Sequence, residues 1–238
     1  MAFPKKSEKE RRRIERKFYR NLCDSIVETI KMFSISKKEL SKRYANDWSV
    51  FNDIKGTNAI VFVSHQFNWE WGTLLTNAMI DKQFVGPYLP LNSKVFDKIL
   101  LKIRSRFGSV AIPINEMARK IPVYQAQDAL CGFVADQTPA DTKRCVWEDF
   151  FHRKTAFAKG GELLAKRYNL PVLMGEMIKV KRGYYQTKIE LTFENPRETE
   201  DGEITAAYVR YLEDSIKRQP ENWVWSHRRW KHVYQKSD

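Results

Sequence analysis

Apolar positions near the start of the chain follow the spacing of an amphipathic helix. Over residues 8–33, apolar side chains recur every three or four positions, as they do along one stripe of a helix. They are Ile14, Phe18, Leu22, Ile26, Ile30 and Phe33. Ser36 stands three residues before Glu39, which is the spacing of a capping box and predicts that a second helix begins there.

Short apolar runs further along the chain predict strands. They occupy residues 59–64, 110–113, 130–135, 172–178 and 187–193, with helical patterns between several of them. The last helical pattern ends before Pro220, which cannot continue a helix. This alternation predicts an α/β fold with a mostly parallel sheet covered by helices. We expect residues 1–50 to form a basic amphipathic helical arm and residues 51–238 to form the main domain.

Two adjacent glycines fall inside one predicted helix. The pattern from Lys154 to Tyr168 predicts that helix, and Gly160 and Gly161 would each destabilise its interior by about 1 kcal/mol relative to alanine. Glycines at such a position suggest the close approach of another backbone or of an acyl chain.

Composition sets limits on the class of protein. The chain has 238 residues, 42% of them hydrophobic, which is enough for a buried core. No run approaches the ~18 apolar residues of a membrane-spanning helix, and the N-terminus lacks the pattern of a secretory signal. Three cysteines without paired spacing predict reduced thiols in the cytosol.

Positive charge is concentrated at the two ends of the chain. The formal net charge is +13. Nine Lys/Arg against three Glu give residues 1–20 a charge of +6, and six Lys/Arg against one Glu give residues 217–236 a charge of +5. Basic ends suggest an acidic partner, which can be nucleic acid, an anionic membrane surface or an acidic protein. A solvated charged helix is the alternative for the first twenty residues.

A histidine follows the first predicted strand, and a glutamate follows five residues later. His65 and Glu70 would lie roughly 140° apart on one helix, but a turn before a helix starting near Asn68 can bring them together. A carboxylate that accepts the Nδ1 proton makes Nε2 a general base toward a substrate hydroxyl. No G-x-S-x-G motif supplies a protein nucleophile. The alternative is a strand-end histidine satisfied by its neighbours.

Four sequence blocks resemble those of one enzyme family. The block from His65 to Glu70, HQFNWE, resembles the H-x-x-N-W-E motif of the late lipid A biosynthesis acyltransferases, within the lysophospholipid-acyltransferase superfamily. Residues 104–108, 132–137 and 220–231 resemble the R-x-x-x-G, strand-plus-Asp-Gln and P-x-x-W-x-W-x-H-x-R-W-K blocks of that family, in the same order. The resemblance covers nearly the whole chain.

The resemblance implies a reaction and a set of site residues. It implies transfer of a fatty acyl group from acyl carrier protein to a hydroxyl of a lipid A precursor or related acylated polar lipid. His65 would be the general base and Glu70 its orienter. Arg104 or backbone N–H groups would stabilise the oxyanion. Asp136 would hold Arg104 or line the acceptor site, unless it only forms a turn. The remaining substrate-binding candidates are Asn68, Gln137 and Arg228.

The closing block offers cations and tryptophans. Arg228, Arg229 and Lys231 are candidates for binding lipid phosphates. Trp223, Trp225 and Trp230 would then sit at the headgroup level, or else belong to the core. The four histidines lack the spacing of metal ligands, so we expect neither a metal nor another cofactor. We also expect a monomer.

The resemblance places the enzyme at the cytoplasmic face of the bacterial inner membrane. Such acyltransferases usually begin with a membrane-spanning helix, whereas this chain starts at a segment resembling the helix that follows it. We therefore expect either a truncated chain or a peripheral protein, the latter anchored to anionic lipid by residues 5–33. A non-catalytic anionic membrane-binding or nucleic-acid-binding protein is the competing interpretation. The chain carries no recognisable nucleic-acid-binding signature, so we expect no nucleic-acid partner.

Overall fold

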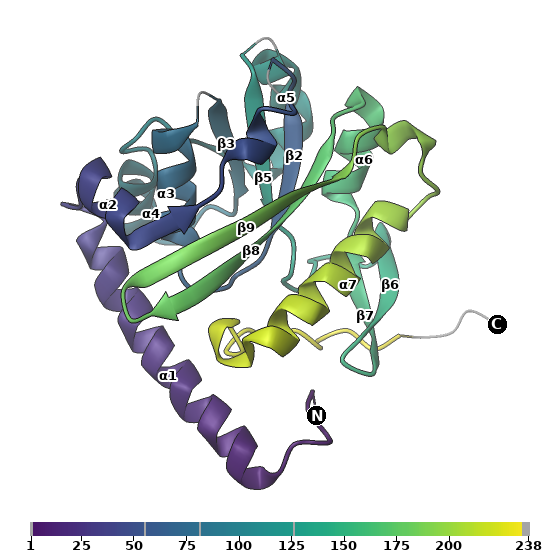
Figure 1. Ribbon diagram of the computed structural model, residues 1–238. Coiled ribbons are helices and arrows are strands. Elements are labelled where there is room, and N and C mark those ends of the chain that lie inside the picture. The colour runs from purple at the N-terminus through teal and green to yellow at the C-terminus, as the bar shows by residue number, and fades with distance from the viewer. Residues whose placement is uncertain (1, 55, 81, 126, 235–238) are drawn as a thin grey trace.

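The protein is an α/β sandwich in which helices cover both faces of a mostly parallel sheet (Figure 1). The computed structural model describes residues 2–54, 56–80, 82–125 and 127–234. The helices in these ranges are α1 (Glu8–Lys31), α2 (Lys37–Arg43), α3 (Trp69–Met79), α4 (Lys94–Arg104), α5 (Met117–Gln125), α6 (Gly160–Tyr168) and α7 (Glu203–Arg218), with short 3₁₀ turns η1 (Ser49–Phe51), η2 (Ile114–Glu116), η3 (Pro196–Glu198) and η4 (Pro220–Asn222). The predicted fold class is confirmed.

Seven strands of the described residues form one sheet. In spatial order they are β1 (Tyr44–Asn46), β9 (Tyr184–Phe193), β8 (Val172–Lys181), β2 (Ala59–Val63), β5 (Ala129–Val134), β3 (Gln83–Tyr88) and β4 (Val110–Pro113). Strands β8, β2, β5, β3 and β4 run parallel to one another, and β9 runs antiparallel to β8. The carboxyl ends of the parallel strands therefore meet at one edge, where α/β proteins gather their functional loops.

The central strands are buried on both faces, which explains their continuous apolar runs. Ile60 and Phe62 of β2 belong to the cluster that packs beneath α5, α6 and α7. Ala59 and Val61, which alternate with them, face the opposite cluster with Phe51 of η1. A strand with this environment has no polar face, so the run was readable as a strand from the sequence.

Each of the five predicted strands is present, but the described residues form four further strands that were not predicted. Strand β3 contains Gly86 and Pro87, which weaken the strand pattern. The hairpin of β6 (Cys145–Phe150) and β7 (Arg153–Ala158) forms a separate two-stranded sheet. The prediction that a helix starts at Lys154 is wrong, because residues 155–157 are buried in β7 and the helix begins at Gly160.

The glycine pair of α6 has a side-chain explanation. A Cβ on Gly161 would lie 2.5 Å from the ring of Phe62, so only glycine fits beneath that ring. The close neighbour of Gly161 is therefore an aromatic side chain of β2 and not a backbone, and the approach of an acyl chain stays a prediction. Gly160 has open space around it.

Helix α1 packs on the body through polar residues and turns apolar residues outward. Ser7 caps its start in a reciprocal capping box with Glu10. Its buried face carries Asn21, Asp24 and Glu28 as well as Phe18. Large apolar side chains on the outward face, in the helix and just past its end, are more than half exposed. They are Tyr19, Ile26, Val27, Ile30 and Phe33. The predicted stripe is thus buried or half-buried from Ile14 to Leu22 and exposed from Ile26 onward.

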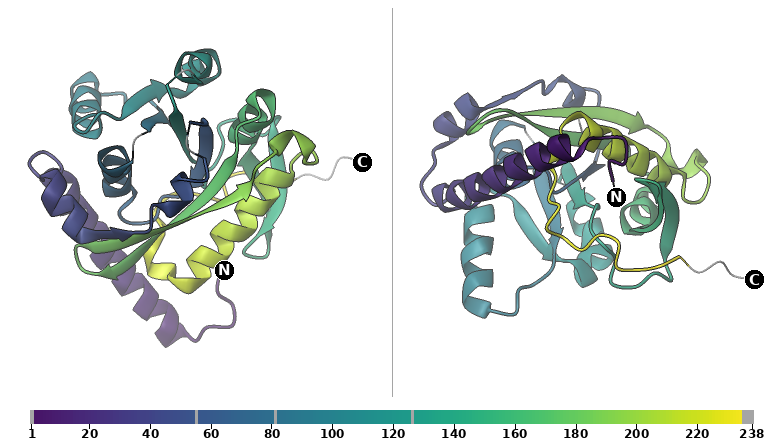
Figure 2. Two further views of the ribbon diagram at one scale, coloured as in Figure 1. Left: turned by 45° about the horizontal axis from the view of Figure 1, so that its top comes forward. Right: turned by 90° about the horizontal axis from the view of Figure 1, so that it is seen from below.

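The C-terminal half of the chain meets α1 along its length. Lys17 pairs with Glu221 at 2.8 Å, and the Asn21 amide donates to the Glu221 carbonyl. Figure 2 shows α1 lying along the outside of the molecule, with the last turn after α7 beside it. Residues 44–46, expected within a helical arm, instead add strand β1 to the sheet next to β9. The division at residue 50 stays a prediction.

Candidate functional site

The site forms where β2 ends and α3 begins. Strand β2 stops at Val63, and Asn68 caps α3 by accepting a hydrogen bond from the Trp71 amide. His65 lies in the turn between them, at the carboxyl edge of the parallel strands. Asp136 follows the neighbouring strand β5 and reaches the same edge. Adjacent parallel strands thus bring two residues that are 71 positions apart into contact.

His65 is held by Asp136. The Nδ1 atom of His65 lies 2.7 Å from Oδ1 of Asp136, and the backbone N–H of His65 donates to the same oxygen at 3.1 Å. An ionised carboxylate only accepts, so Nδ1 carries the proton and Nε2 of the neutral ring presents a lone pair. The His65 side chain is 20% exposed, whereas Asp136 is buried. Nε2 is thereby oriented as a base that a ligand can reach.

The buried carboxylate of Asp136 stays ionised. Burial alone would raise the pKa of Asp136, but the charge of His65 and hydrogen bonds from His65 and Trp223 outweigh it and lower that pKa. The Trp223 indole N–H donates to Oδ2 at 2.6 Å. Because both oxygens have partners, the carboxylate can stabilise an imidazolium without turning away from it.

Glu70 is paired with Arg104 and not with His65. Arg104 donates to both carboxylate oxygens of Glu70, through Nε at 3.0 Å and Nη2 at 2.5 Å. Glu70 lies in the first turn of α3, where a negative charge is favourable, and Arg104 ends α4. The expected contact between Glu70 and His65 is therefore wrong, because the turn aims Nδ1 at Asp136. The expectation that Asp136 holds Arg104 is wrong for the same reason.

Arg104 keeps unused N–H donors beside this pair. Burial would lower the pKa of Arg104, but the hydrogen bond and charge of Glu70 raise it. Within the described ranges, its Nη1 has no hydrogen-bond partner. Arg104 is thus a fixed cation, and its predicted role toward the oxyanion stays a prediction.

Asn68 shapes the turn from a buried position. Its amide oxygen accepts from Trp71, and its amide nitrogen donates to Glu28 of α1 at 3.0 Å. It is buried with both polar atoms occupied, and its expected role in binding substrate stays a prediction. Burial raises the pKa of Glu28, and hydrogen bonds from Tyr185 and Asn68 offset part of that effect. The turn is thereby tied to α1.

Residues 222–229, the C-terminal strap, fasten the other side of the turn. The Phe67 amide donates to the Asn222 carbonyl at 2.9 Å, and the Val224 amide donates to the His65 carbonyl at 3.1 Å. Trp223, within this strap, reaches Asp136. Sequence reasoning missed the contact of Trp223 with Asp136, although the tryptophan-rich closing block marked the segment.

One family comparison matches nearly the whole chain. The sequence model of a family described as bacterial lipid A biosynthesis acyltransferase matches residues 1–232. The chain belongs to this family. The family identifies the protein as an acyltransferase of lipid A biosynthesis in general terms. A search of curated proteins found no match.

Two further substrate-binding candidates of this acyltransferase remain available. Gln137 is half-buried next to Asp136, and Arg228 is exposed on the C-terminal strap. In the part of the chain that the structure describes, neither side chain has a hydrogen bond or an ion pair. Gln137 adjoins Asp136 in the chain, and the Arg228 carbonyl accepts from the Thr138 hydroxyl two residues after Asp136, so both residues lie near the site.

Arg229 is buried in the core of the acyltransferase. It is buried, its Nη2 donates to the Ala156 carbonyl at 2.6 Å, and its guanidinium lies 4.2 Å from the Phe157 ring centroid. Burial lowers the pKa of Arg229 to about 10, although the charge of Asp136 opposes this. The expectation that Arg229 binds lipid phosphate is wrong. Trp223 is also core, while Trp225 and Trp230 are half-buried.

His227 lies near the acyltransferase site with its ring nitrogen occupied. Its Nε2 accepts a hydrogen bond from the Thr138 amide at 3.0 Å. Burial lowers the pKa of His227, and the charge of Asp136 opposes that shift. A neutral His227 therefore helps to hold the loop after Asp136. No set of three His, Cys, Asp or Glu side chains suited to a metal ion occurs among the described residues.

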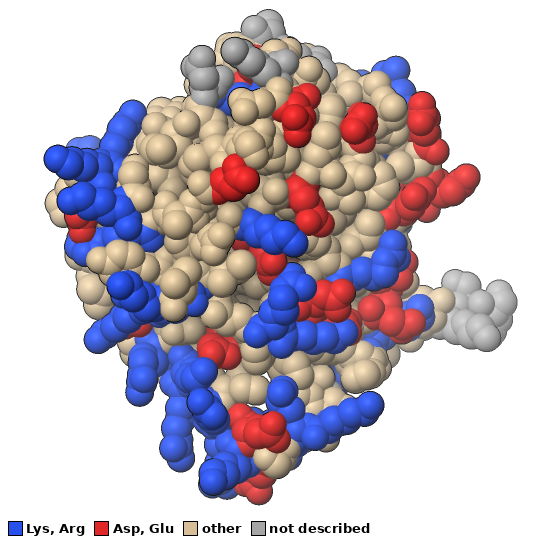
Figure 3. Space-filling model, in the orientation of Figure 1, with Lys and Arg blue, Asp and Glu red and all other residues tan. Residues whose placement is uncertain are grey.

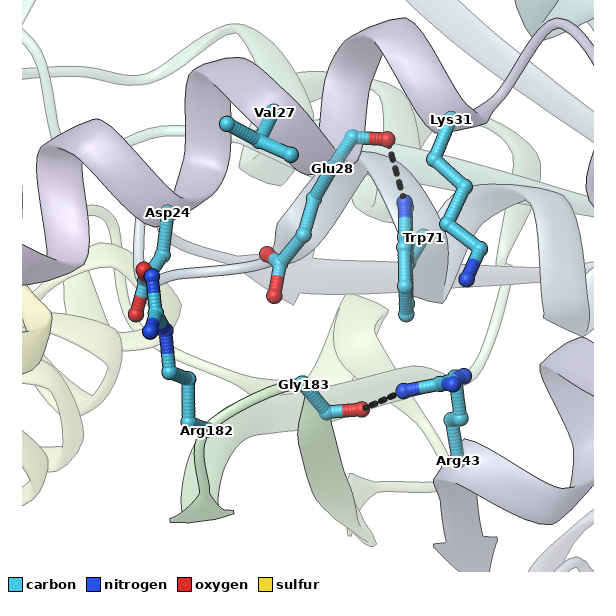
Figure 4. Close-up of a pocket in the computed structure, with 8 residues that line it drawn as sticks. All are labelled: Asp24, Val27, Glu28, Lys31, Arg43, Trp71, Arg182 and Gly183. Atoms are coloured by element: carbon cyan, nitrogen blue, oxygen red, sulfur yellow. Dashed lines mark hydrogen bonds and ion pairs between the residues drawn. The ribbon is translucent and has the colours of Figure 1, made fainter.

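Two cavities of the acyltransferase lie beside α1, and His65 is not among the residues that line them. One, of about 270 Å³, holds the carboxylates of Asp24 and Glu28 and the cations Lys31, Arg43 and Arg182 (Figure 4). The Trp71 indole on its wall donates to the Glu28 carbonyl. The other, of about 360 Å³, is mainly apolar: its lining includes Phe3, Ile14, Phe18, Tyr19 and Trp225. In the described ranges, every helix is too short or too polar to cross a bilayer.

Proposed function

We propose that the protein transfers a fatty acyl group from acyl carrier protein to a hydroxyl of a lipid A precursor or a related acylated polar lipid. The observation that carries this proposal is the 2.7 Å contact between Nδ1 of His65 and the buried carboxylate of Asp136. It orients Nε2 as the base that such a transfer requires. The family match supports the class of acceptor.

The reaction follows from this pair. Nε2 of His65 takes the proton of the acceptor hydroxyl as its oxygen attacks the thioester carbonyl carbon. Asp136 stabilises the imidazolium that forms. The tetrahedral intermediate carries a negative oxygen, for which the free Nη1 of Arg104 or a backbone N–H is a donor. Collapse of the intermediate breaks the carbon–sulfur bond, and the leaving thiolate takes the proton from Nε2.

The acceptor is proposed to reach the site from an anionic membrane at the cytoplasmic face of the bacterial inner membrane. The outward face of α1 supports this, because exposed Tyr19, Ile26 and Ile30 follow exposed Arg12 and Arg16 along the same helix. Such a helix fits the boundary between headgroups and acyl chains. Figure 3 shows Lys and Arg side chains gathered along α1.

The acidic acyl carrier protein is proposed to dock near Arg228. Lys154 and Lys159 carry the same charge as Arg228, but Lys154 pairs with Asp149 and Lys159 pairs with Asp201 at 2.5 Å. Arg228 has no such partner within the described residues, and its backbone carbonyl accepts from the Thr138 hydroxyl, two residues after Asp136. Its charge supports the docking of an acidic donor beside the site.

The proposal is tested by incubating the purified protein with isotopically labelled acyl carrier proteins of several chain lengths and with detergent-dispersed acceptors. The account predicts an ester of the acceptor that carries the label, identified by mass spectrometry, and release of the carrier thiol in equal amount. A non-catalytic membrane-binding protein would release no thiol above the rate without protein. That result would contradict the proposal.

A further inference from the structure

Four large apolar side chains are exposed together where β3 leads into α4. Leu89, Leu91, Val95 and Phe96 are 71%, 44%, 67% and 64% exposed, and they are called the apolar lip below. Single exposed apolar residues are common on protein surfaces, but four within eight positions form a patch that indicates a binding surface.

The apolar lip is an ordered part of the fold. The Leu91 amide donates to the Asp97 side chain at 2.9 Å, and the Asp97 amide donates to the Ser93 carbonyl at 2.9 Å. Helix α4 is anchored further on by buried Ile103 and by the pair of Arg104 with Glu70. These contacts hold the apolar side chains outward at fixed positions, so their exposure does not come from a loose loop.

The apolar lip lies at the edge of the sheet that carries the site. It follows the carboxyl end of β3, and β3 is the parallel neighbour of β5, after which Asp136 lies. The far end of α4 is tied by Arg104 to Glu70, five residues after His65. Figure 2, in the view from below, shows α4 standing out from the body at this side. A surface that binds the lip would therefore lie next to the site.

Unpaired lysines accompany the lip. Lys94, Lys98 and Lys102 are exposed at four-residue spacing on α4, and within the described ranges none has an ion pair. Apolar side chains at the tip of a helix with lysines along its side match a lipid surface, because the tip can enter the acyl layer while the ammonium groups stay among anionic headgroups. An acidic protein would match the lysines but not the protruding apolar tip.

We infer that the apolar lip inserts into an anionic lipid bilayer and brings the His65 edge of the sheet against it. This contact is separate from that of α1. Its purpose, the delivery of a membrane-embedded acceptor, rests on the proposed function, but lipid binding by the lip does not. The lysines contribute an electrostatic part of the lipid-binding free energy, which salt screens. The apolar side chains contribute a hydrophobic part, which salt does not weaken.

The test is co-sedimentation of the full chain with vesicles of phosphatidylcholine alone or mixed with phosphatidylglycerol. Val95→Ser with Phe96→Ser should weaken partitioning onto the anionic vesicles by about tenfold or more, since each apolar side chain loses its burial. Val123→Ser is the matched control, because Val123 is 61% exposed on α5, outside the lip. It should change partitioning less than about twofold. The difference between the variants should persist at high salt.

A second measurement does not depend on loss of binding. In the Phe96→Trp variant, the added fluorescence should be quenched by brominated lipid in anionic vesicles. Absence of added quenching, together with unchanged partitioning of the double variant, would overturn the inference. The inference would also be overturned if acyl carrier protein alone, or a second copy of the chain, covered the apolar lip in solution. Vesicle binding uses no acyl donor, so lip-dependent binding without turnover would refute the proposed function and leave this inference standing.

Discussion

The indole of Trp223 donates to the carboxylate oxygen of Asp136 that His65 leaves free, at 2.6 Å. Trp223 of the C-terminal strap thereby holds Asp136 in place, and Asp136 in turn orients His65. The strap also accepts a hydrogen bond from the Phe67 amide and donates one to the His65 carbonyl. The turn is therefore held through the Asp136 side chain and through its own backbone. The end of the chain thus takes part in positioning groups that lie some 160 residues earlier, as the residue numbers show.

Trp223→Phe should lower kcat by up to about tenfold with little change in KM, because Asp136 loses one of its charge-stabilising hydrogen bonds. The matched control is Trp225→Phe, which also loses a 2.6 Å indole bond, in this case to the Pro220 carbonyl. Steady-state kinetics with detergent-dispersed acceptor compare the two. Equal losses in both variants would show that Trp223 acts only through packing.

Glu70→Gln should reduce activity by weakening its hold on Arg104. In a chain that already carries Arg104→Gln, the same change should then cost little further activity, since the two residues act as one pair. The measurement is kcat/KM for the two single variants and the double variant. A full additional loss from Glu70→Gln in the Arg104→Gln background would mean that Glu70 acts elsewhere, for example on His65.

The stability contributed by Asp136 should depend on pH. Burial opposes ionisation, but His65 and Trp223 lower the pKa of Asp136 below its unfolded value, so its contribution is present above the unfolded pKa of about 4 and is lost as the pH falls through the lower folded pKa. The difference in unfolding free energy between wild type and Asp136→Asn should therefore shrink below about pH 4. Urea unfolding from pH 7 to pH 3 measures it. A difference that stays constant would contradict this assignment, and exposed Asp149→Asn serves as the control.

Removal of positive charge from α1 should weaken membrane binding without changing the chemistry. Arg12, Arg13 and Arg16 are exposed, so their replacement by glutamine should leave the fold intact. Binding to anionic vesicles should fall most clearly at low salt, where screening lengths of ~30 Å replace the ~8 Å of physiological buffer. Turnover on detergent-dispersed acceptor should not change. A raised KM for acyl carrier protein in detergent would instead assign these arginines to donor docking.

The sequence was sufficient for the parts of the fold that repeat a local pattern. Strand β2 is buried on both faces, so Ile60, Val61 and Phe62 form a run that only a central strand explains. The start of α2 was also readable, because the Ser36 cap is a contact within four residues. In contrast, β7 was read as a helix, since its strand pairing depends on a hairpin partner, β6, that was not recognised.

Which side chains pair within the site depends on tertiary contacts, and local sequence spacing does not predict these. His65 and Glu70 were grouped because they lie in one motif, but parallel pairing of β2 with β5 delivers Asp136 to His65. Asn68 in the same motif is taken up by the helix cap and by Glu28. Likewise, nothing local distinguishes buried Arg229 from exposed Arg228. The sequence predicted that His65, Glu70, Arg104 and Asp136 gather at this edge, and the tertiary structure determined how they pair.

The central claim is that Nε2 of His65, oriented by Asp136, is the base of acyl transfer. The most direct test is the initial rate of transfer from labelled acyl carrier protein by His65→Ala in detergent, with far-UV circular dichroism confirming the fold. The account predicts a rate roughly 10²–10⁴-fold below that of the wild type. A folded His65→Ala variant that transfers the acyl group at nearly the wild-type rate would contradict it.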